Sequence, residues 1–203
     1  MRFKRVHPNE FDFCPKTYVM PEDYRLLITD HDVSPSSLLI MKPVSQSCGR
    51  GITVLNQKSE VKRKPGFVVQ QYLSPLLING LKFDLRVYCL VTSYDPLKVY
   101  MFREGLVRFA TQKYSQSKET LDQRYMHLTN YSVNKRSQSY NKADSQSESS
   151  KWSFAQLKSY FDKQGYSFSV LLQRISDIIV KTLLAIEPHV YQAVVRNAKR
   201  NAN

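Results

Sequence analysis

Cysteines, glycines and long apolar runs are scarce in this sequence. The three cysteines, Cys14, Cys48 and Cys89, are far apart and odd in number, which argues against a disulfide framework and against a cysteine zinc site. No stretch approaches the length of a membrane span, and the N-terminal residues MRFKR are followed by no apolar signal region. We therefore expect an unsecreted protein in a reducing compartment, with no membrane partner.

Acidic residues are also few. The 17 Asp and Glu residues stand against 30 Lys and Arg residues, so the formal net charge is +13 over 203 residues. This excess favours an acidic partner, either nucleic acid, an anionic membrane or an acidic protein surface, and charge alone does not choose among them. The hydrophobic fraction of 42% excludes a disordered chain and is enough for one domain with a core.

Familiar catalytic and nucleic-acid-binding patterns are absent. The four histidines lie in unrelated contexts without the spacing of metal ligands, and there is no nucleophile elbow. His127 either belongs to a site or is a hydrogen-bonded structural histidine, and the sequence leaves both open. No RRM, KH, zinc-finger or helix-turn-helix pattern occurs, and most aromatic residues alternate into the core side of strands, so we expect no nucleic-acid partner.

Hydrophobic periodicity predicts strands first and helices last, an α+β class. The predicted strands are 38–41, 52–55, 67–73, 82–91, 98–102 and 106–110, the last three forming an antiparallel meander. A short helix is predicted over 21–28. Ser153 is expected to cap a helix that Gly165 ends, and Ser169 a longer one that Pro188 kinks or ends.

The predicted strand 82–91 carries three charges on one face. Phe83, Leu85, Val87, Cys89 and Val91 alternate with Lys82, Asp84, Arg86 and Tyr88, so a strand would bury the first set and expose the second. Same-face neighbours lie roughly 7 Å apart, which makes a fixed array of alternating charge that suits an anionic ligand. A solvated strand face with ordinary ion pairs explains the same spacing equally well.

A second candidate for anion binding is the glycine-containing loop 44–51, which follows Lys42. Its backbone N–H groups and the lysine suit phosphate, although the loop matches neither the Walker A nor the dinucleotide pattern, and a plain glycine hairpin is the commoner meaning. Together with Lys82, Asp84, Arg86 and Arg108 from one sheet region, and with Asn130 as a neutral ligand, Lys42 points to phosphoryl chemistry.

Four stretches carry a family resemblance: FDFCPKTYVMPEDY, IMKPVSQSCGRGI, VVQQYLSPLLINGLKFDLRVYCLVTSYDPLKVYMFREGLVRFAT and HLTNYSVNK. They resemble the tubulin tyrosine ligase-like family from Phe11 to about Glu187, and most of all its branch that adds glutamate to tubulin tails. The resemblance implies an ATP-grasp-like fold, with a mostly antiparallel sheet and flanking helices. It also implies a ligase that uses ATP to activate a glutamyl carboxylate as an acyl phosphate, which the amine of a free L-glutamate attacks.

The resemblance also assigns residues. The positions that match its ATP-binding residues are Lys42, Cys48, Gly49, Gln70, Gln71, Tyr72, Leu73, Lys82, Phe83, Asp84, Thr129 and Asn130, with residues 70–73 as the hinge strand against adenine. Those that match the glutamate site are Arg108, Tyr131, Ser132 and Lys151. Arg108 would hold a substrate carboxylate, and Arg86 would lie near the transferred phosphate. The implied partners are tubulin and microtubules, in the cytoplasm at the cytoskeleton, with cilium and basal body as candidate locations.

Two departures from the family pattern qualify these expectations. Cys48 stands where the family usually has an arginine. The family's Mg²⁺ ligands, an aspartate and a Glu-x-Asn pair on later strands, have no counterpart here, because only Asp177 and Glu187 carry carboxylates after Gln164. We therefore expect one incomplete domain, truncated at both ends and lacking its metal-binding strands. The alternatives are an inactive member that only binds tubulin or ATP, and a ligase for a non-tubulin acidic protein.

Within that single domain the expected parts follow the chain. They are a subdomain with the phosphate loop and hinge strand over 1–75, substrate- and ATP-binding strands over 76–133, a mobile loop over 134–150 and C-terminal helices over 151–203.

Overall fold

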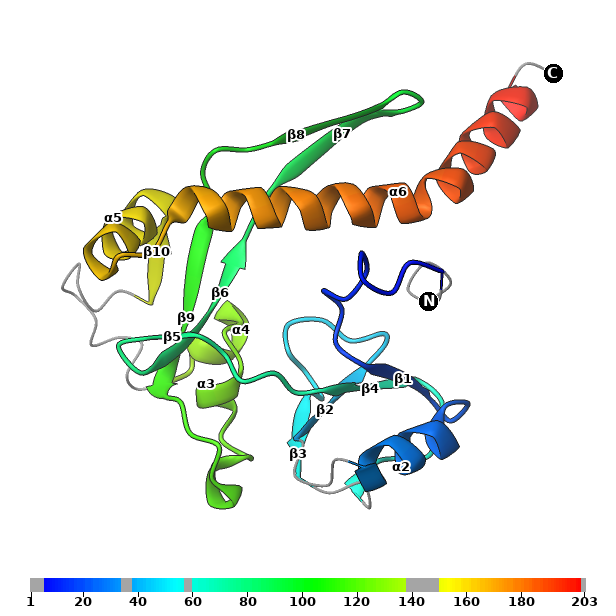
Figure 1. Cartoon of the computed structure of the whole chain (residues 1–203). Coiled ribbons are helices and arrows are strands. Elements are labelled where there is room, and N and C mark those ends of the chain that lie inside the picture. Colours follow the sequence, from blue (N-terminus) through cyan, green and yellow to red (C-terminus); the bar gives the residue numbers. More distant parts are fainter. Residues whose placement is uncertain (1–5, 34–37, 57–59, 138–149, 202–203) are drawn as a thin grey trace. The chain divides into compact units, whose positions relative to one another are not determined.

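The computed structural model describes residues 6–33, 38–56, 60–137 and 150–201 (Figure 1). The chain forms two compact units. The first comprises Cys14–Leu85 and Val107–Lys151, and the second comprises Met1–Phe13, Arg86–Leu106 and Trp152–Asn203. The expected mobile loop falls almost entirely on residues 138–149, which lie outside the described part of the chain.

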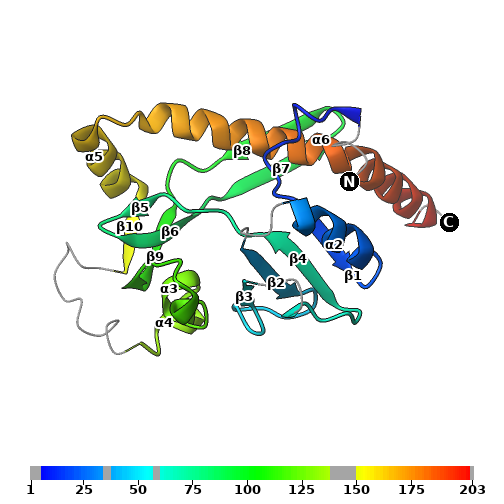
Figure 2. The same cartoon turned by 60° about the horizontal axis from the view of Figure 1, so that its bottom comes forward.

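A four-stranded sheet opens the first unit, in the order β1-β4-β2-β3 (Figure 2). Its strands are β1 (Thr17–Met20), β2 (Leu39–Pro43), β3 (Thr53–Leu55) and β4 (Phe67–Gln71), and its paired strands run antiparallel. The helix α2 (Tyr24–Val33) follows β1 and begins later and extends further than the predicted 21–28. The predicted strands 38–41, 52–55 and 67–73 are confirmed in type, with ends shifted by one or two residues.

Both faces of β2 are covered. Leu39 and Met41 belong to a core cluster with Leu27 and Val69, whereas Ile40 packs in a second cluster with Tyr72 and others. Alternate residues of a strand point to opposite faces, so Lys42 lies on the Ile40 face. The register pairs Ile40 with Gln70 and Lys42 with Val68, which puts the Gln70 side chain on that face as well.

The second sheet of this unit has the order β10-β9-β6-β5. Its strands are β5 (Leu77–Ile78), β6 (Leu81–Arg86), β9 (Leu106–Lys113) and β10 (Lys151–Ser153). Asn79 and Gly80 both adopt positive φ, 52° and 77°, and join β5 to β6 in the tight turn that their residue types favour. Because β6 and β9 are neighbours, Asp84 and Arg108 come within reach of each other.

The predicted strand 82–91 is wrong in one respect, because it is broken. β6 ends at Arg86, and β7 (Cys89–Tyr94) pairs instead with β8 (Leu97–Met101) in a separate two-stranded sheet. The predicted meander is therefore wrong too, since β9 pairs with β6 and not with β8. The apolar alternation runs on through the break, so it does not report where the strand changes partners. One consequence is that Cys89, predicted to be buried, is exposed.

Helices fill the remainder. The predicted loop 115–124 contains the 3-10 turn η2 (Lys118–Thr120), and the short helices α3 (Arg124–His127) and α4 (Tyr131–Asn134) follow it. The predicted bounds of α5 (Phe154–Gln164) are confirmed: Ser153 and Gln156 form a reciprocal capping box, and Gly165 ends the helix at φ 76°.

The last helix, α6 (Phe168–Asn201), continues through Pro188, and its axis bends toward its final part (Figure 1). No helix in the described ranges is both long and apolar enough to span a membrane.

Gly105, between β8 and β9, is tightly enclosed within the second unit. A Cβ atom there would overlap the Phe154 ring and lie 2.6 Å from the backbone oxygen of Arg86. We expect Gly105→Ala to lower the free energy of unfolding by about 1–3 kcal/mol, because the buried ring and the backbone must both shift. Urea denaturation would measure this, with Ser159→Ala on the exposed face of α5 as the control. A Gly105→Ala protein as stable as the control would contradict the tight packing.

Candidate functional site

Two half-buried lysines face the same region of the first unit. Lys42 lies in β2 and Lys82 lies in β6, and these strands belong to two different sheets, so the prediction that both lysines come from one sheet region is wrong. Burial lowers the pKa of Lys42 below its ordinary value. Burial, and then the positive charge of Lys42, lower the pKa of Lys82 to about 8, against the opposing effect of Asp84. Two desolvated ammonium groups that repel each other form a site that an anion would stabilise.

The Lys42 side chain is held by the neighbouring strand. Its Nζ donates to Oε1 of Gln70 at 2.7 Å, and Nε2 of Gln70 donates to Oγ1 of Thr17 at 2.8 Å. In the expected hinge strand 70–73, therefore, Gln70 and Tyr72 face inward, whereas Gln71 and Leu73 are exposed. This alternation leaves two of the four side chains in contact with the lysine region.

Tyr72 connects Lys82 to a buried histidine. The Lys82 ammonium donates to the Tyr72 hydroxyl at 3.0 Å and lies 4.6 Å from the centre of its ring. The same hydroxyl is 3.0 Å from Nδ1 of His127, whose Nε2 is 3.2 Å from the carbonyl oxygen of Thr120. His127 is only 2% exposed, and burial lowers its pKa. The sequence left the role of His127 open, and the structure gives it these partners.

Arg108 on β9 and Asp84 on β6 form a bidentate ion pair. Nε of Arg108 donates to Oδ1 of Asp84 at 2.9 Å, and Nη2 donates to Oδ2 at 2.6 Å. The family resemblance implied that the carboxylate serves the nucleotide and the arginine the amino acid, and no sequence pattern indicated that the two side chains pair. A guanidinium has five N–H donors, so this fork leaves others for a second carboxylate.

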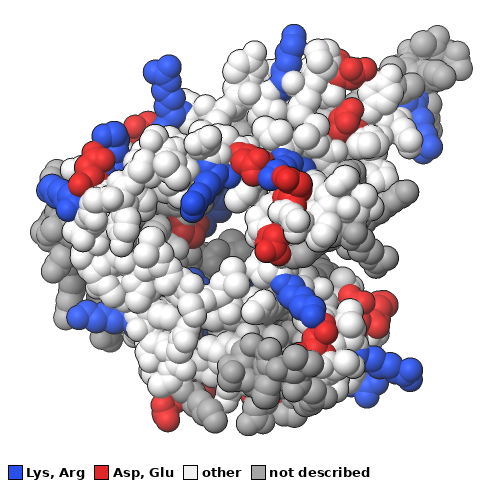
Figure 3. Space-filling model, viewed as in Figure 1, with Lys and Arg blue, Asp and Glu red and all other residues white. Residues whose placement is uncertain are grey.

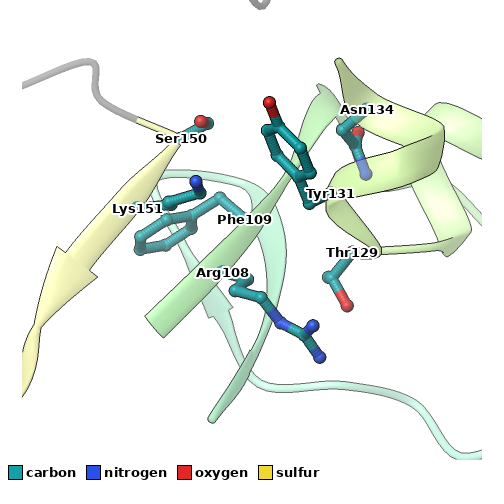
Figure 4. A pocket seen from close by; sticks show the side chains of 7 residues that line it. All are labelled: Arg108, Phe109, Thr129, Tyr131, Asn134, Ser150 and Lys151. Carbon is teal, nitrogen blue, oxygen red and sulfur yellow. The ribbon is translucent and has the colours of Figure 1, made fainter. Parts of the chain in front are cut away.

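A hollow beside this pair is lined by residues from β9, α3–α4 and β10 (Figure 4). They are Arg108, Phe109, Thr129, Tyr131, Asn134, Ser150 and Lys151. The Lys151 ammonium lies 4.4 Å from the centre of the Tyr131 ring, so these two lining side chains contact each other. Three of the four residues expected to bind glutamate thus line one hollow, and the fourth, Ser132, does not line it.

Ser132 and its neighbours instead hold the glycine loop. Its Oγ donates to the Cys48 carbonyl oxygen at 3.0 Å, and Nη2 of Arg124 donates to the carbonyl of Gly49 at 2.6 Å. Cys48 and Gly49 both have positive φ, and a Cβ at Gly49 would lie 2.9 Å from Oδ1 of Asn130. Hydrogen bonds with Ser47 and then Ser132 lower the pKa of the exposed Cys48 thiol. The loop is therefore anchored to α3 and α4.

Sequence reasoning missed Asn134, which fixes α4 against β9. Its Oδ1 accepts from the backbone N–H and the hydroxyl of Thr111, and its Nδ2 donates to the carbonyls of Leu128 and Asn130. All four bonds of the buried carboxamide are therefore made. The only signal in the sequence was an asparagine shortly after HLTNYS, and its partner Thr111 lies on β9, which the sequence does not place beside it.

The comparisons with known proteins decide the family. The family model described as "Tubulin-tyrosine ligase family" matches residues 1–203. The chain belongs to the tubulin-tyrosine ligase family. This confirms the resemblance and the α+β class that it implied, with antiparallel sheets and few helices.

Several members of the tubulin-tyrosine ligase family are similar to this chain over most of its length. Tubulin monoglutamylase TTLL4 of Mus musculus is 41% identical over 189 residues, which are 92% of this chain and 16% of that protein. Tubulin polyglutamylase TTLL6 of Mus musculus is 40% identical, over 92% of this chain and 23% of its own length. Tubulin polyglutamylase TTLL5 of Homo sapiens is 36% identical, over 92% of this chain and 15% of its own length. The chain therefore spans less than a quarter of the length of these curated relatives.

Two more family-matched residues have distinct surroundings. Phe83 packs against Phe109, with ring centres 6.0 Å apart, and so contributes to the sheet's packing. Arg86 ends β6 with an exposed side chain and belongs to the second compact unit, whereas the lysines and the hollow belong to the first.

The described residues do not fit a Mg²⁺ site. Among them there is no group of three or more His, Cys, Asp or Glu side chains that is close enough to hold a metal ion. Asp84, the carboxylate that acts on Lys82, is engaged by Arg108. Magnesium coordinates oxygen ligands, chiefly carboxylates, so no step of the chemistry below is assigned to a metal held by these residues.

Proposed function

We propose that the chain is part of an ATP-dependent tubulin-glutamate ligase of the polyglutamylase type. It would add glutamate to glutamate side chains in the C-terminal tails of tubulin. The observation that carries this proposal is a pair of half-buried lysines from two different sheets that are held by neighbouring residues of one segment: Lys42 donates to Gln70 at 2.7 Å, and Lys82 donates to the Tyr72 hydroxyl at 3.0 Å. The names of its relatives, which are tubulin mono- and polyglutamylases, supply the substrate class.

The lysines would neutralise the phosphates of ATP. Phosphoryl transfer needs little from a protein beyond positioning and charge stabilisation, and two ammonium groups from different sheets offer both. The loop at Cys48 and Gly49 would lie over the phosphates, and Thr129 and Asn130 would face the nucleotide. In the wider set of ATP contacts we include Gln70, Gln71, Tyr72, Leu73, Phe83 and Asp84, with Arg86 near the transferred phosphate.

The hollow at Arg108 would receive the incoming L-glutamate. Glutamate carries two carboxylates, and the hollow's lining offers two cations, Arg108 and Lys151, together with Tyr131. The N–H groups of Arg108 that Asp84 does not use suit one carboxylate, and Lys151 suits the other. Ser132 would support this site through the loop that it anchors.

The reaction would then proceed in two steps. A glutamyl carboxylate of the tubulin tail attacks the γ-phosphorus of ATP, which forms an acyl phosphate and releases ADP. The amine of the bound glutamate next attacks the acyl carbon, which forms the amide and releases phosphate. The contribution of these residues is to hold the phosphates and to orient the amine, which lowers the entropy cost of both encounters.

The basic composition suits an acidic tubulin tail. The net charge is +13, and Figure 3 shows Lys and Arg side chains spread over the viewed face among Asp and Glu rather than gathered in one strip. Such a surface would attract an acidic tail at long range, and the attraction would weaken with salt. We propose tubulin and microtubules as partners, and the cytoplasm at the cytoskeleton, cilium and basal body included, as the location.

The test is glutamate incorporation. The chain is incubated with ATP, labelled L-glutamate and either purified tubulin or whole lysate, and labelled proteins are separated. Label in tubulin supports the proposal, and label only in other acidic proteins would overturn tubulin as the substrate. Binding of ATP or tubulin without any incorporation would favour the alternative, a member of the family that binds without turnover.

The lowered pKa of Lys82 predicts a pH dependence of ATP binding. An ammonium with a pKa of about 8 is charged at lower pH and loses its proton as the pH rises, so affinity should fall above about pH 8. The loss is at most about tenfold per pH unit, because one proton is involved. ATP titrations at several pH values would measure it. Lys82→Arg, which stays charged, is the control and should show a flatter profile; equal profiles would contradict the assignment.

A further inference from the structure

The hydroxyl of Tyr72 lies between an ammonium and an imidazole. Nζ of Lys82 and Nδ1 of His127 are each 3.0 Å from it, and the Tyr114 side chain also hydrogen bonds to Tyr72. Tyr72 and His127 are buried, and the rings of Tyr72 and Tyr114 meet the imidazole edge-on, with centres 5.8 and 5.6 Å away. These side chains come from separate segments and meet only in the fold.

The direction of the hydrogen bonds follows from the groups at each end. The carbonyl oxygen of Thr120 only accepts, so Nε2 of His127 carries the proton. Burial and the nearby charge of Lys82 favour the neutral ring, against the opposing effect of the Thr120 carbonyl, so Nδ1 is bare and accepts from the Tyr72 hydroxyl. The hydroxyl's proton is then directed to His127, so its oxygen accepts from the Lys82 ammonium with one lone pair and from the Tyr114 hydroxyl with the other.

We propose that His127 is a positioning residue that, through the Tyr72 hydroxyl, fixes the place of the Lys82 ammonium. This rests on the proposed function only in that Lys82 serves the nucleotide. A lysine side chain has several rotatable bonds, and holding its ammonium in one place before ATP arrives removes an ordering cost from binding. Neither His127 nor the Tyr72 hydroxyl needs to touch ATP for this.

A double-mutant cycle on ATP affinity tests this hydrogen-bond relay, in which His127 positions the Lys82 ammonium through the Tyr72 hydroxyl. Tyr72→Phe keeps the ring and removes the hydroxyl, and it should weaken ATP binding about three- to tenfold, the range expected for the loss of one ordinary hydrogen bond that acts on ATP only through Lys82. In a Lys82→Ala background the same substitution should have no further effect, because its target is gone. Equal effects of Tyr72→Phe in both backgrounds would overturn the relay, since a merely structural role is additive.

Two further variants separate position from folding. His127→Asn keeps a hydrogen-bond acceptor near the place of Nδ1 and should retain more affinity than His127→Leu, although both alter the core. Equal loss in the two would count against the relay. Tyr191→Phe, on an exposed part of α6, is the matched control and should leave the affinity for ATP unchanged.

A second readout does not depend on nucleotide. ¹⁵N NMR of the histidine side chains should show His127 as the neutral tautomer with its proton on Nε2, and Tyr72→Phe should shift the Nδ1 signal. A proton on Nδ1 in the wild type, or no shift in the variant, would overturn the relay. If the wild-type chain binds no ATP, the proposed function fails, and the tautomer and its response to Tyr72→Phe decide the hydrogen-bond relay alone.

Discussion

Replacing Lys82 with alanine should weaken ATP binding by at least about tenfold. A hydrogen-bonded ion contact with phosphate contributes roughly 1.5–3 kcal/mol, and each 1.4 kcal/mol is a factor of ten. Lys82 is half-buried and close to Lys42, so its charge acts in a medium that screens poorly. Isothermal titration with ATP measures the effect.

The control for this substitution is Lys158→Ala. Lys158 is exposed on α5, where it pairs with Asp162 one turn away, and its loss should leave the affinity for ATP unchanged. Lys82→Ala should not destabilise the fold through charge, because it removes an ammonium whose desolvation and repulsion by Lys42 are unfavourable. An unaltered dissociation constant for ATP in a folded Lys82→Ala protein would remove this lysine from the site.

Replacing Arg108 with alanine should abolish glutamate addition while ATP binding is largely kept. The guanidinium lines the hollow and its fork holds Asp84, so the variant loses a carboxylate ligand and leaves Asp84 without this partner. We expect glutamate incorporation to fall by at least about thirtyfold, because a charge-assisted hydrogen bond to the substrate is lost and Asp84 is no longer held in place. Labelled-glutamate transfer and ATP titration on the same preparation measure the two effects.

Arg108→Lys sharpens this prediction. Lysine keeps the charge but cannot form the planar fork with Asp84, so transfer should remain low if orientation matters and recover if charge alone suffices. Arg174→Ala, at an exposed position of α6, is the control and should transfer glutamate at the wild-type rate. Unchanged transfer by Arg108→Ala would refute the role of this hollow as the amino-acid site.

Local signals predicted the parts of the fold that depend on neighbouring residues. The bounds of α5 followed from Ser153 and Gly165, because capping and a left-handed C-terminal residue act within a few positions of the chain. The turn at Asn79 and Gly80 followed from the same kind of chemistry. The break after Arg86 did not follow, because the strand's partners, β5 and β9 on one side and β8 on the other, are chosen by tertiary packing.

The same distinction applies to the candidate site. Lysines on apolar strands and Arg108, with phosphate as a natural ligand, could be singled out from the sequence, and the family resemblance added Tyr131 and Lys151. The pairing of Asp84 with Arg108 could not be predicted, since it depends on which strand lies beside β6. The role of His127 stayed open and Asn134 was missed for a similar reason: each is a polar residue with partners on other elements, so its role appears only when the elements pack.

The most direct test of the central claim is a lysine-acylation footprint with and without ATP, read by peptide mass spectrometry. We expect ATP to protect both Lys42 and Lys82 from acylation, whereas the exposed Lys158 should be modified equally in both samples. Acylation of Lys42 and Lys82 that is unaffected by saturating ATP would contradict a nucleotide site between the two lysines, and the proposed ligase function would fall with it.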